Sequence, residues 1–389
     1  MKSIINIPFF TKAFQKLLFT VCKISLMIIL ISSCNKETNN NTNNNNDPDQ
    51  DIVASTGATH TVIVRSDGTL WGSGNNHEGQ LGDNTNINKN IFIKILDNVK
   101  YVNAGNHQTM IIKKDGSLWA TGYNDEGQLG DGTVTYKFVP VKIMEDVRFV
   151  STGYNHTMII KTDNSLWATG ANLHGQFGAP APPRSYIPLK VMDNVKSVNA
   201  GFYYTMILKT DNTLWATGRN ADGQFGNSTN TSTNIPVKVM DNVKSICASD
   251  HDVFVIKSDN SLWVAGRNDS GELGTGNTNP VTTYTKVMDN VIAVTAGEQH
   301  SLILKNDNSL WGCGDNGQGQ LGDGSGTSRT VFIKLRDNIK SLFNGFESSH
   351  SFIVMNDNTI WATGYNEFGQ LGDSTNSFQK YFFAKINLP

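Results

Sequence analysis

Cysteine, helical periodicity and catalytic signatures are all scarce in this sequence. The 389 residues include four cysteines, Cys22, Cys34, Cys247 and Cys313, and none of them forms a Cys-x-x-Cys pair. This spacing disfavours a zinc site and gives no support for a disulfide. The chain also lacks a Gly-x-Ser-x-Gly elbow, a His-Glu-x-x-His pair and a phosphate-binding loop. The sequence therefore predicts no metal, no cofactor and no recognisable catalytic residue.

Acidic residues are absent from the first 33 residues, which contain four lysines and an apolar stretch over 17–31. This pattern is typical of a secretory signal, and the stretch is marginal as a spanning helix. The segment ends in "ISSC" at residues 31–34, which resembles the lipobox of bacterial lipoproteins. That resemblance implies that Cys34 is lipidated and becomes the mature N-terminus. The alternative is an uncleaved membrane anchor.

Apolar residues are missing from the stretch that follows Cys34, "NKETNNNTNNNNDPDQ". Such a segment cannot bury enough surface to offset chain entropy, so residues 34–50 are predicted to form a lipidated, disordered tether. Asn35 stands where some bacteria place an aspartate that retains lipoproteins in the inner membrane. We therefore expect a lipid-anchored protein of the cell envelope, in the outer membrane, on its periplasmic or its surface side.

Positive charge is also in short supply beyond the signal. Residues 34–389 hold 28 Lys and Arg against 34 Asp and Glu, which gives a net charge of −6. Nucleic-acid binding depends on neutralising phosphates, so this balance argues against a nucleic-acid partner.

Tryptophan is rare, yet every copy belongs to one internal repeat. Successive tryptophans lie 48 residues apart, except for a last step of 50, at Trp71, Trp119, Trp167, Trp215, Trp263, Trp311 and Trp361. Each is preceded by an apolar run and a turn built on Asp, and followed by Gly, Asn and Gly-Gln-Leu-Gly or a close variant. Seven copies of one unit are typical of repeat architectures.

The repeat unit contains four short runs rich in β-branched and aromatic residues. In the fourth copy they are 187–192 (A), 195–201 (B), 205–210 (C) and 213–218 (D), and none shows helical periodicity. Asp-Asn or Asp-Gly separates A from B and C from D, and these pairs suit the left-handed backbone of two-residue hairpin turns.

Four antiparallel strands repeated seven times predict an all-β fold, a seven-bladed β-propeller over residues 51–389. A right-handed β-helix is the rival fold, but its coils are usually shorter. The first copy lacks run A, and the chain ends with a surplus one. We therefore expect residues 381–386 to complete the first blade, pair near residues 52–55 and close the ring.

The repeat resembles the family named for the regulator of chromosome condensation. The resemblance rests on Gly57-x-x-His60, Asp67-Gly68, Leu70-Trp71, Gly74-Asn75 and Gly79-Gln80-Leu81-Gly82, and on their downstream copies. It implies a seven-bladed propeller. The family includes a nuclear exchange factor for a small GTPase and a secreted bacterial inhibitor of β-lactamases, so the resemblance implies fold rather than activity. Exchange activity is not expected, because it depends on an insertion that is not recognisable here.

Two repeated polar positions are interpreted as structural. Gln80 and its copies, with Glu272 in one repeat, are expected at the contacts between blades. His60, His156, His300 and His350 share another position, which Tyr204 occupies in the fourth copy. At a radius of about 8 Å, equivalent atoms of neighbouring blades lie about 7 Å apart, whereas zinc needs nitrogen ligands at about 2.0–2.1 Å. These histidines are therefore too far apart to share a metal ion.

The repeats differ mainly in the B–C and D–A loops, which alternate strand direction places on one face. The D–A loops include residues 179–188 and 323–330. The candidate ligand-binding residues on this face are Tyr154, Phe202, Tyr203, Asp250, Asp252, Glu298, Phe346 and Glu347. Aromatic side chains carry much of the energy of protein interfaces, and variable loops on a rigid scaffold are the usual place for recognition. Neutral drift in tolerant loops would give the same variation.

These observations predict a membrane-anchored, non-enzymatic propeller that binds another protein through this face. One alternative is a hydrolase or lyase that acts on surface glycans, which would need two carboxylates converging in a deep pocket. A purely structural cell-surface spacer is the other alternative.

Overall fold

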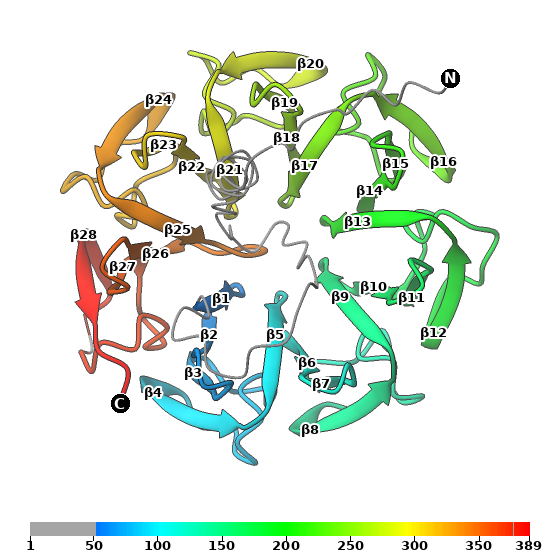
Figure 1. Cartoon of the computed structure of the whole chain (residues 1–389), viewed down its shortest axis with the longest axis horizontal. Helices are drawn as coiled ribbons and strands as arrows, with labels where there is room; N and C mark the ends of the chain where they lie inside the picture. Colours follow the sequence, from blue (N-terminus) through cyan, green and yellow to red (C-terminus); the bar gives the residue numbers. More distant parts are fainter. Residues whose placement is uncertain (1–51, 376) are drawn as a thin grey trace, which may run out of the picture. The chain divides into compact units, whose positions relative to one another are not determined.

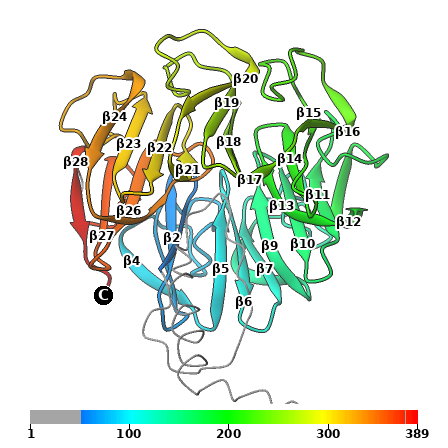
Figure 2. The same cartoon turned by 45° about the horizontal axis from the view of Figure 1, so that its top comes forward.

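The computed structural model describes residues 52–375 and 377–389, and the predicted signal, Cys34 and the tether lie outside them. Within this part of the chain the regular structure consists of strands, arranged as seven four-stranded antiparallel sheets. The sheets stand around a central axis as blades 1 to 7 in chain order (Figure 1), and Figure 2 shows them side by side. The predicted seven-bladed, all-β propeller is confirmed.

The two inner strands of each blade correspond to runs B and C. The innermost strands are β1 (Val53–Thr56), β5 (Val99–Ala104), β9 (Val147–Thr152), β13 (Val195–Ala200), β17 (Val243–Ala248), β21 (Val291–Ala296) and β25 (Ile339–Phe343). The second strands are β2 (His60–Val64), β6 (Gln108–Lys113), β10 (His156–Lys161), β14 (Tyr204–Lys209), β18 (Asp252–Lys257), β22 (His300–Lys305) and β26 (His350–Met355). The second strands are buried on both faces because neighbouring blades pack against them.

The two outer strands correspond to runs D and A. The third strands are β3 (Leu70–Gly74), β7 (Leu118–Gly122), β11 (Leu166–Ala171), β15 (Leu214–Gly218), β19 (Leu262–Gly266), β23 (Leu310–Gly314) and β27 (Ile360–Tyr365). The outermost are β4 (Lys89–Leu96), β8 (Lys137–Met144), β12 (Arg184–Met192), β16 (Thr233–Met240), β20 (Val281–Met288), β24 (Arg329–Arg336) and β28 (Gln379–Ile386).

Run A belongs to the preceding blade, so the unit chosen from the sequence spans two sheets. In blade 3, β12 pairs with β11, and Trp167 lies opposite Lys190. Pro188 occupies this outer strand, where a residue without an N–H group costs no ladder hydrogen bond. The short A–B connection is therefore a link between blades and not a hairpin. Its ends are fixed because Val99 N–H donates to Gly68 O over 2.9 Å.

The C–D connections are hairpin loops of three residues rather than two. In blade 1, Arg65 N–H donates to Thr69 O and Gly68 N–H donates to Arg65 O, both over 2.9 Å. This is a turn followed by one left-handed residue, Gly68, with φ of 86°. Asn takes the left-handed position in the later copies, for example Asn212 with φ of 64°. The left-handed backbone expected at Asp-Asn and Asp-Gly is present, but only at the second residue of each pair.

The expected closure of the ring by a shared strand is wrong. β28 pairs with β27 in blade 7, and blade 1 is completed by its own β4. The ring closes through contacts between complete sheets: His350 Nε2 lies 2.9 Å from Thr61 Oγ1, and Ser374 N–H donates to Asn90 O over 2.9 Å. Because run A follows D in every blade, the chain starts with B and ends with A without leaving a gap.

The repeated tryptophan is held by a short relay of hydrogen bonds. In blade 3, Ser165 N–H and Oγ both bind Asp163 Oδ1, and Trp167 Nε1 donates to Ser165 Oγ over 2.9 Å. The Lys161 ammonium lies 5.9 Å from the indole centre, and the other six tryptophans likewise have a Lys or Arg over the ring. The relay fixes each C–D turn to its third strand, which explains why the phrase recurs.

Candidate interaction face

One asparagine in each blade anchors the D–A loop. Asn76 Oδ1 accepts the N–H of Leu81 over 2.9 Å, and its Nδ2 donates to Asp83 Oδ1 and to Thr85 O. The same acceptor bond recurs at Asn124, Asn172, Asn220, Asn268, Asn316 and Asn366. Each variable D–A loop is therefore held in place by a buried asparagine that recurs in every blade.

The side chain at the histidine position links neighbouring blades beneath the face formed by the B–C and D–A loops. His60 Nε2 lies 3.0 Å from Thr109 Oγ1, and that hydroxyl donates to Gln80 O over 2.7 Å. The hydroxyl proton is used in the second bond, so Nε2 of His60 is the donor in the first. Burial lowers the pKa of His60 to about 3, which keeps the ring neutral. A side chain on Gly57 would collide with this ring and with the next blade's Gly105 O.

The B–C loops meet around the axis above these joints. Neighbouring loops share backbone hydrogen bonds: Phe202 N–H donates to Asp250 O, and Glu298 N–H donates to Ser348 O, both over 3.1 Å. These bonds link blade 4 to 5 and blade 6 to 7. The B–C loops of these blade pairs are therefore held to each other and are not independent.

Four of the predicted aromatic residues form a cluster on this surface. The ring centres of Tyr154 and Phe202 lie 4.5 Å apart, and those of Phe202 and Tyr203 lie 4.3 Å apart. Phe346 lies 6.4 Å from Tyr154. Tyr154, Phe202 and Tyr203 are half-buried, whereas Phe346 is buried. Residues that are up to 192 positions apart in the sequence are thus brought into contact.

The contact between Tyr154 and Phe346 crosses the axis, from blade 3 to blade 7. It depends on the B–C loop of blade 7, which has two more residues than the other loops and accounts for the 50-residue step between the last tryptophans. Glu347 in this loop has φ of 55°, a left-handed conformation that is uncommon for a residue with a long side chain. Phe346 covers a central cavity of only about 20 Å³ that Asn103 and Asn199 also line.

Three carboxyl groups lie beside the aromatic cluster. Asp250 is 7% exposed, while Glu298 and Glu347 are half-buried. Burial, Glu347 and Glu298 together raise the pKa of Asp250 well above its usual value, against a smaller opposing effect of Arg267. Burial and then Glu298 raise the pKa of Glu347 to about 7. Glu298 therefore disfavours ionisation of both Asp250 and Glu347, and Glu347 disfavours ionisation of Asp250.

Asp252 does not belong to this face, contrary to the prediction. It is the first residue of β18 and 2% exposed, at the position that His60 holds in blade 1. The side chain points into the joint between blades 5 and 6 because residues alternate in direction along a strand and the preceding loop is only three residues long. Burial and Glu272 raise its pKa well above the usual value.

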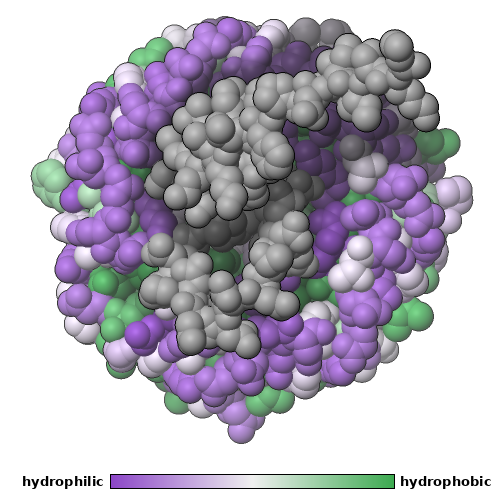
Figure 3. All heavy atoms as spheres, viewed as in Figure 1, coloured by the Kyte–Doolittle hydropathy of each residue, from purple (hydrophilic) through white to green (hydrophobic). Residues whose placement is uncertain are grey.

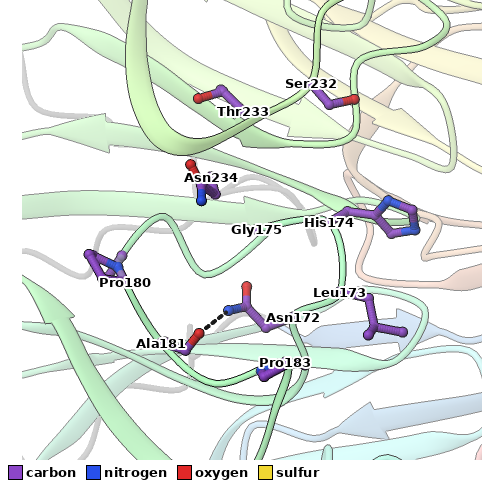
Figure 4. Close-up of a pocket in the computed structure, with 11 residues that line it drawn as sticks. Asn172, Leu173, His174, Gly175, Pro180, Ala181, Pro183, Ser232, Thr233 and Asn234 are labelled. Atoms are coloured by element: carbon purple, nitrogen blue, oxygen red, sulfur yellow. Dashed lines mark hydrogen bonds between the residues drawn. The ribbon is translucent and has the colours of Figure 1, made fainter.

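A pocket of about 580 Å³ lies beside the aromatic cluster, between the D–A loops of blades 3 and 4. Figure 4 shows Asn172, Pro180 and Pro183 on one side of it and Ser232, Thr233 and Asn234 on the other. The lining residues are Asn172, Leu173, His174, Gly175, Ala179, Pro180, Ala181, Pro183, Ser232, Thr233 and Asn234, and they include no carboxylate. Residues 179–183 of the predicted variable loop thus form one wall.

Two histidines extend the cluster, and neither was among the predicted site residues. His174, which is exposed at the pocket, stacks against Tyr203 with ring centres 4.8 Å apart. His251 lies 5.1 Å from Phe202 and 3.0 Å from the Asp222 carboxylate. Both stand next to repeated motifs, so only their lack of a counterpart in most copies distinguishes them in the sequence. No group of three or more His, Cys, Asp or Glu among residues 52–375 and 377–389 could hold a metal ion.

The remaining exposed apolar residues are dispersed. On the face seen in Figure 3, hydrophobic residues lie mainly at the rim of a hydrophilic surface. Several of them occupy one position of the outermost strands, at Ile91, Val139, Ile187, Ile235, Val331 and Phe382. Single exposed aliphatic residues of this kind need no functional explanation.

Comparisons with known proteins agree with this architecture. Yeast RCC1 (Prp20), solved bound to Kap60, is 20% identical with a TM-score of 0.68, over 75% of this chain and 77% of that one. Human WBSCR16 is 19% identical with a TM-score of 0.66, over 77% and 86%. The ectodomain of the Arabidopsis thaliana receptor kinase ACR4 is 14% identical with a TM-score of 0.51, over 87% and 98%. At these identities the likeness shows a shared fold.

No curated protein matches the chain. A family model described as the RCC1-like domain matches residues 30–331, which is most of the sequence. The seven blades, the repeated motifs and this match lead to one conclusion: the chain belongs to the RCC1-like domain family.

Proposed function

We propose that this protein is a lipid-anchored lipoprotein of the bacterial cell envelope and binds another protein through the face of the B–C and D–A loops. The RCC1-like propeller serves protein interaction in relatives such as yeast RCC1, which was solved bound to Kap60. The anchor rests on the signal-like segment and on Cys34, which precede the described residues.

The observation that carries the binding proposal is the half-exposed cluster of Tyr154, Phe202 and Tyr203. Aromatic side chains bury large areas at a low cost in conformational entropy, so they are preferred anchors of protein interfaces. The cluster lies beside a pocket of about 580 Å³ that would admit a side chain or a loop of a partner.

The glycan-active alternative has less support. The acids at the axis lie above a cavity of about 20 Å³, which is too small for a sugar ring, and the larger pocket has no carboxylate in its lining. Two carboxyl groups flanking a bound sugar are what glycoside hydrolysis needs. A surface spacer would not require a joined aromatic cluster.

Site-specific photo-crosslinking tests the binding face. A photoreactive amino acid in place of Tyr203 is expected to give a defined crosslinked species in envelope extract. The same amino acid in place of Thr210, an exposed residue of a C–D turn on the opposite face, is the matched control. The crosslinked species should disappear when Tyr154 and Phe202 are changed to Ala. Equal crosslinking from both faces would contradict the proposal.

Labelling with a fatty-acid analogue tests the anchor. The full chain should incorporate the label and sediment with membranes, whereas Cys34→Ser should lose the label and be released. Accessibility of the propeller to protease on intact cells then distinguishes the surface from the periplasm. A labelled C34S variant would refute lipidation at this residue. Among the residues that the structure describes, no helix is long and apolar enough to cross a membrane.

A further inference from the structure

Asp250 is a buried acid without a matching positive charge. It is 7% exposed, and its Oδ1 is buried without a hydrogen-bond partner. Arg267 is the cation that acts on it, but the Arg267 guanidinium is engaged 3.2 Å from the Asp269 carboxylate. A buried carboxyl group in this position stays protonated or attracts a cation, because an unpaired buried charge is costly.

Two further acids face Asp250 from the next two blades. Glu298 lies in the B–C loop of blade 6, where Ser349 Oγ donates to it over 3.4 Å. Glu347 lies in the extended loop of blade 7. The carboxyl groups of Glu298 and Glu347 both act on Asp250, and Glu298 also acts on Glu347. One positive charge placed among them would relieve the repulsion of all three.

The acids are interleaved with aromatic rings. Glu347 and Asp250 both raise the pKa of Tyr154, although burial of the phenol has the larger effect, so the phenol and the two acids are near one another. Phe202 is fixed to the Asp250 backbone, and Phe346 precedes Glu347. Aromatic faces together with carboxylates form a favourable environment for an organic cation.

The chemistry of the site selects the kind of cation. A bare Ca²⁺ takes six to eight oxygen ligands, whereas the described residues contain no group that could hold a metal ion. Lysine and arginine carry their charge at the end of a long apolar stem, which suits a site where carboxyl groups lie beside aromatic rings.

We propose that the axial site formed by Asp250, Glu298 and Glu347 with the rings of Tyr154, Phe202 and Phe346 receives one lysine or arginine side chain of the partner protein. This inference rests on the proposed function and names the chemistry of the partner. The cation pairs with the acids, and its methylene stem lies against the rings. The extended loop of blade 7 supplies two of the six residues.

Two short peptides test the site on the purified propeller. One is an acetylated and amidated pentapeptide with a central lysine, and the other carries norleucine at that position. Titrations followed by saturation-transfer NMR should show binding of the lysine peptide, in the millimolar range, and none of the norleucine peptide. An arginine peptide should bind as well.

Removal of negative charge from the site is the second test. Glu298→Gln with Glu347→Gln should weaken binding of the lysine peptide by at least about tenfold, with a melting temperature no lower than that of the wild type, because the change removes repulsion among the three acids. Glu145→Gln, an exposed acid of an A–B turn on the opposite face, is the matched control. Binding should also tighten from pH 6 to pH 8, because the Glu347 carboxyl, with a pKa of about 7, must ionise to hold the cation.

The two proposals fail in different ways. Equal binding of the lysine and norleucine peptides, or binding that survives removal of both glutamates, would overturn the cation site. A partner that crosslinks at the Tyr203 position as strongly in the double variant as in the wild type would leave the proposed function intact and still overturn this inference. Loss of that crosslink in the double variant, together with lysine-specific peptide binding, would support it.

Discussion

At the residue scale, the joint between blades 5 and 6 differs from the other joints in two side chains. Asp252 stands where four blades have a histidine and the other two have Gln108 and Tyr204, and Glu272 replaces the glutamine of Gly-Gln-Leu-Gly. One oxygen of each carboxyl group is buried without a hydrogen-bond partner, as is Ser301 Oγ in the facing strand. In the corresponding joint, Ser351 Oγ bonds both His300 and Gln320 O. Two acids thus occupy a place that neutral groups fill elsewhere.

The first prediction concerns the pH dependence of this joint. Burial and then Glu272 raise the pKa of Asp252 in the folded state. A raised folded pKa stabilises the protein at low pH, and this stabilisation is lost as pH rises through the folded value. Unfolding in urea should therefore show Asp252→Asn gaining stability relative to wild type as pH increases, by at most about 1.4 kcal/mol per pH unit.

The other groups that act on Asp252 are Arg267, Asp250 and Asp222, and the comparison must keep them unchanged. Glu272→Gln should show the same direction, because burial raises its pKa too. If wild type and D252N differ by a constant amount between pH 5 and pH 8, Asp252 is already ionised in the folded protein at pH 5, which contradicts the prediction.

At the scale of the element, the outermost strands are buried on one face only. In β28, Phe383 is 8% exposed and packs with Leu304, Leu321 and Leu342, whereas its neighbour Phe382 is 68% exposed. This contrast follows from the alternation of side chains along a strand. The adjacent pair offers a matched experiment at the very end of the chain.

The second prediction uses this pair. Phe383→Ala should lower the free energy of unfolding by about 3–5 kcal/mol, as expected for a buried phenylalanine, and Phe382→Ala should change it by less than about 0.5 kcal/mol. Chemical denaturation of the two variants checks this. Similar losses for both would mean that β28 does not lie against β27 in the observed register.

The third prediction concerns the C–D turns, where Asn212 has φ of 64°. Asn212→Gly should be neutral within about 0.5 kcal/mol, while Asn212→Val should be destabilising by about 1–3 kcal/mol, because a β-branched residue strains a left-handed backbone. Thermal melting of both variants is the measurement. A valine variant as stable as the glycine one would argue against this turn conformation.

At the scale of the whole molecule, the contact that closes the ring resembles the other contacts between blades. The closing joint between blades 7 and 1 pairs His350 Nε2 with Thr61 Oγ1 as an internal joint pairs His156 Nε2 with Thr205 Oγ1, although the Thr205 hydroxyl also donates to Gln176 O. Phe92 and Ile386 belong to one core cluster that spans blades 1 and 7. Closure therefore depends on packing between finished sheets.

The fourth prediction follows from this equivalence. Thr61→Val at the closing joint and Thr205→Val at the internal joint should each cost about 1–3 kcal/mol, the usual cost of leaving a buried polar partner unsatisfied. Equilibrium unfolding of the two variants gives the comparison. A much smaller loss for T61V than for T205V would show that blades 1 and 7 separate easily.

The sequence predicted the number of blades, the strand runs and the face of the variable loops, because the tryptophan spacing and the Asp-Asn pairs report local structure directly. It did not assign run A to its sheet, since an alternating strand can pair with either neighbour until the ladder is known. It also placed Asp252 on a loop, although the alignment of His60 with its copies puts residue 252 at the start of a strand. The contact of Tyr154 with Phe346 was not predictable, because it depends on the ring diameter.

The two additional residues in the last B–C loop have one more consequence. Seven similar blades around one axis offer a bound molecule seven nearly equivalent orientations, and this rotational ambiguity reduces the preference for any one of them. The longer loop carries Phe346 and Glu347 over the hub toward Tyr154 and leaves the opposite side without a counterpart. The longer loop thereby breaks the sevenfold pseudosymmetry of the propeller, and one orientation of a bound molecule is distinguished from the other six.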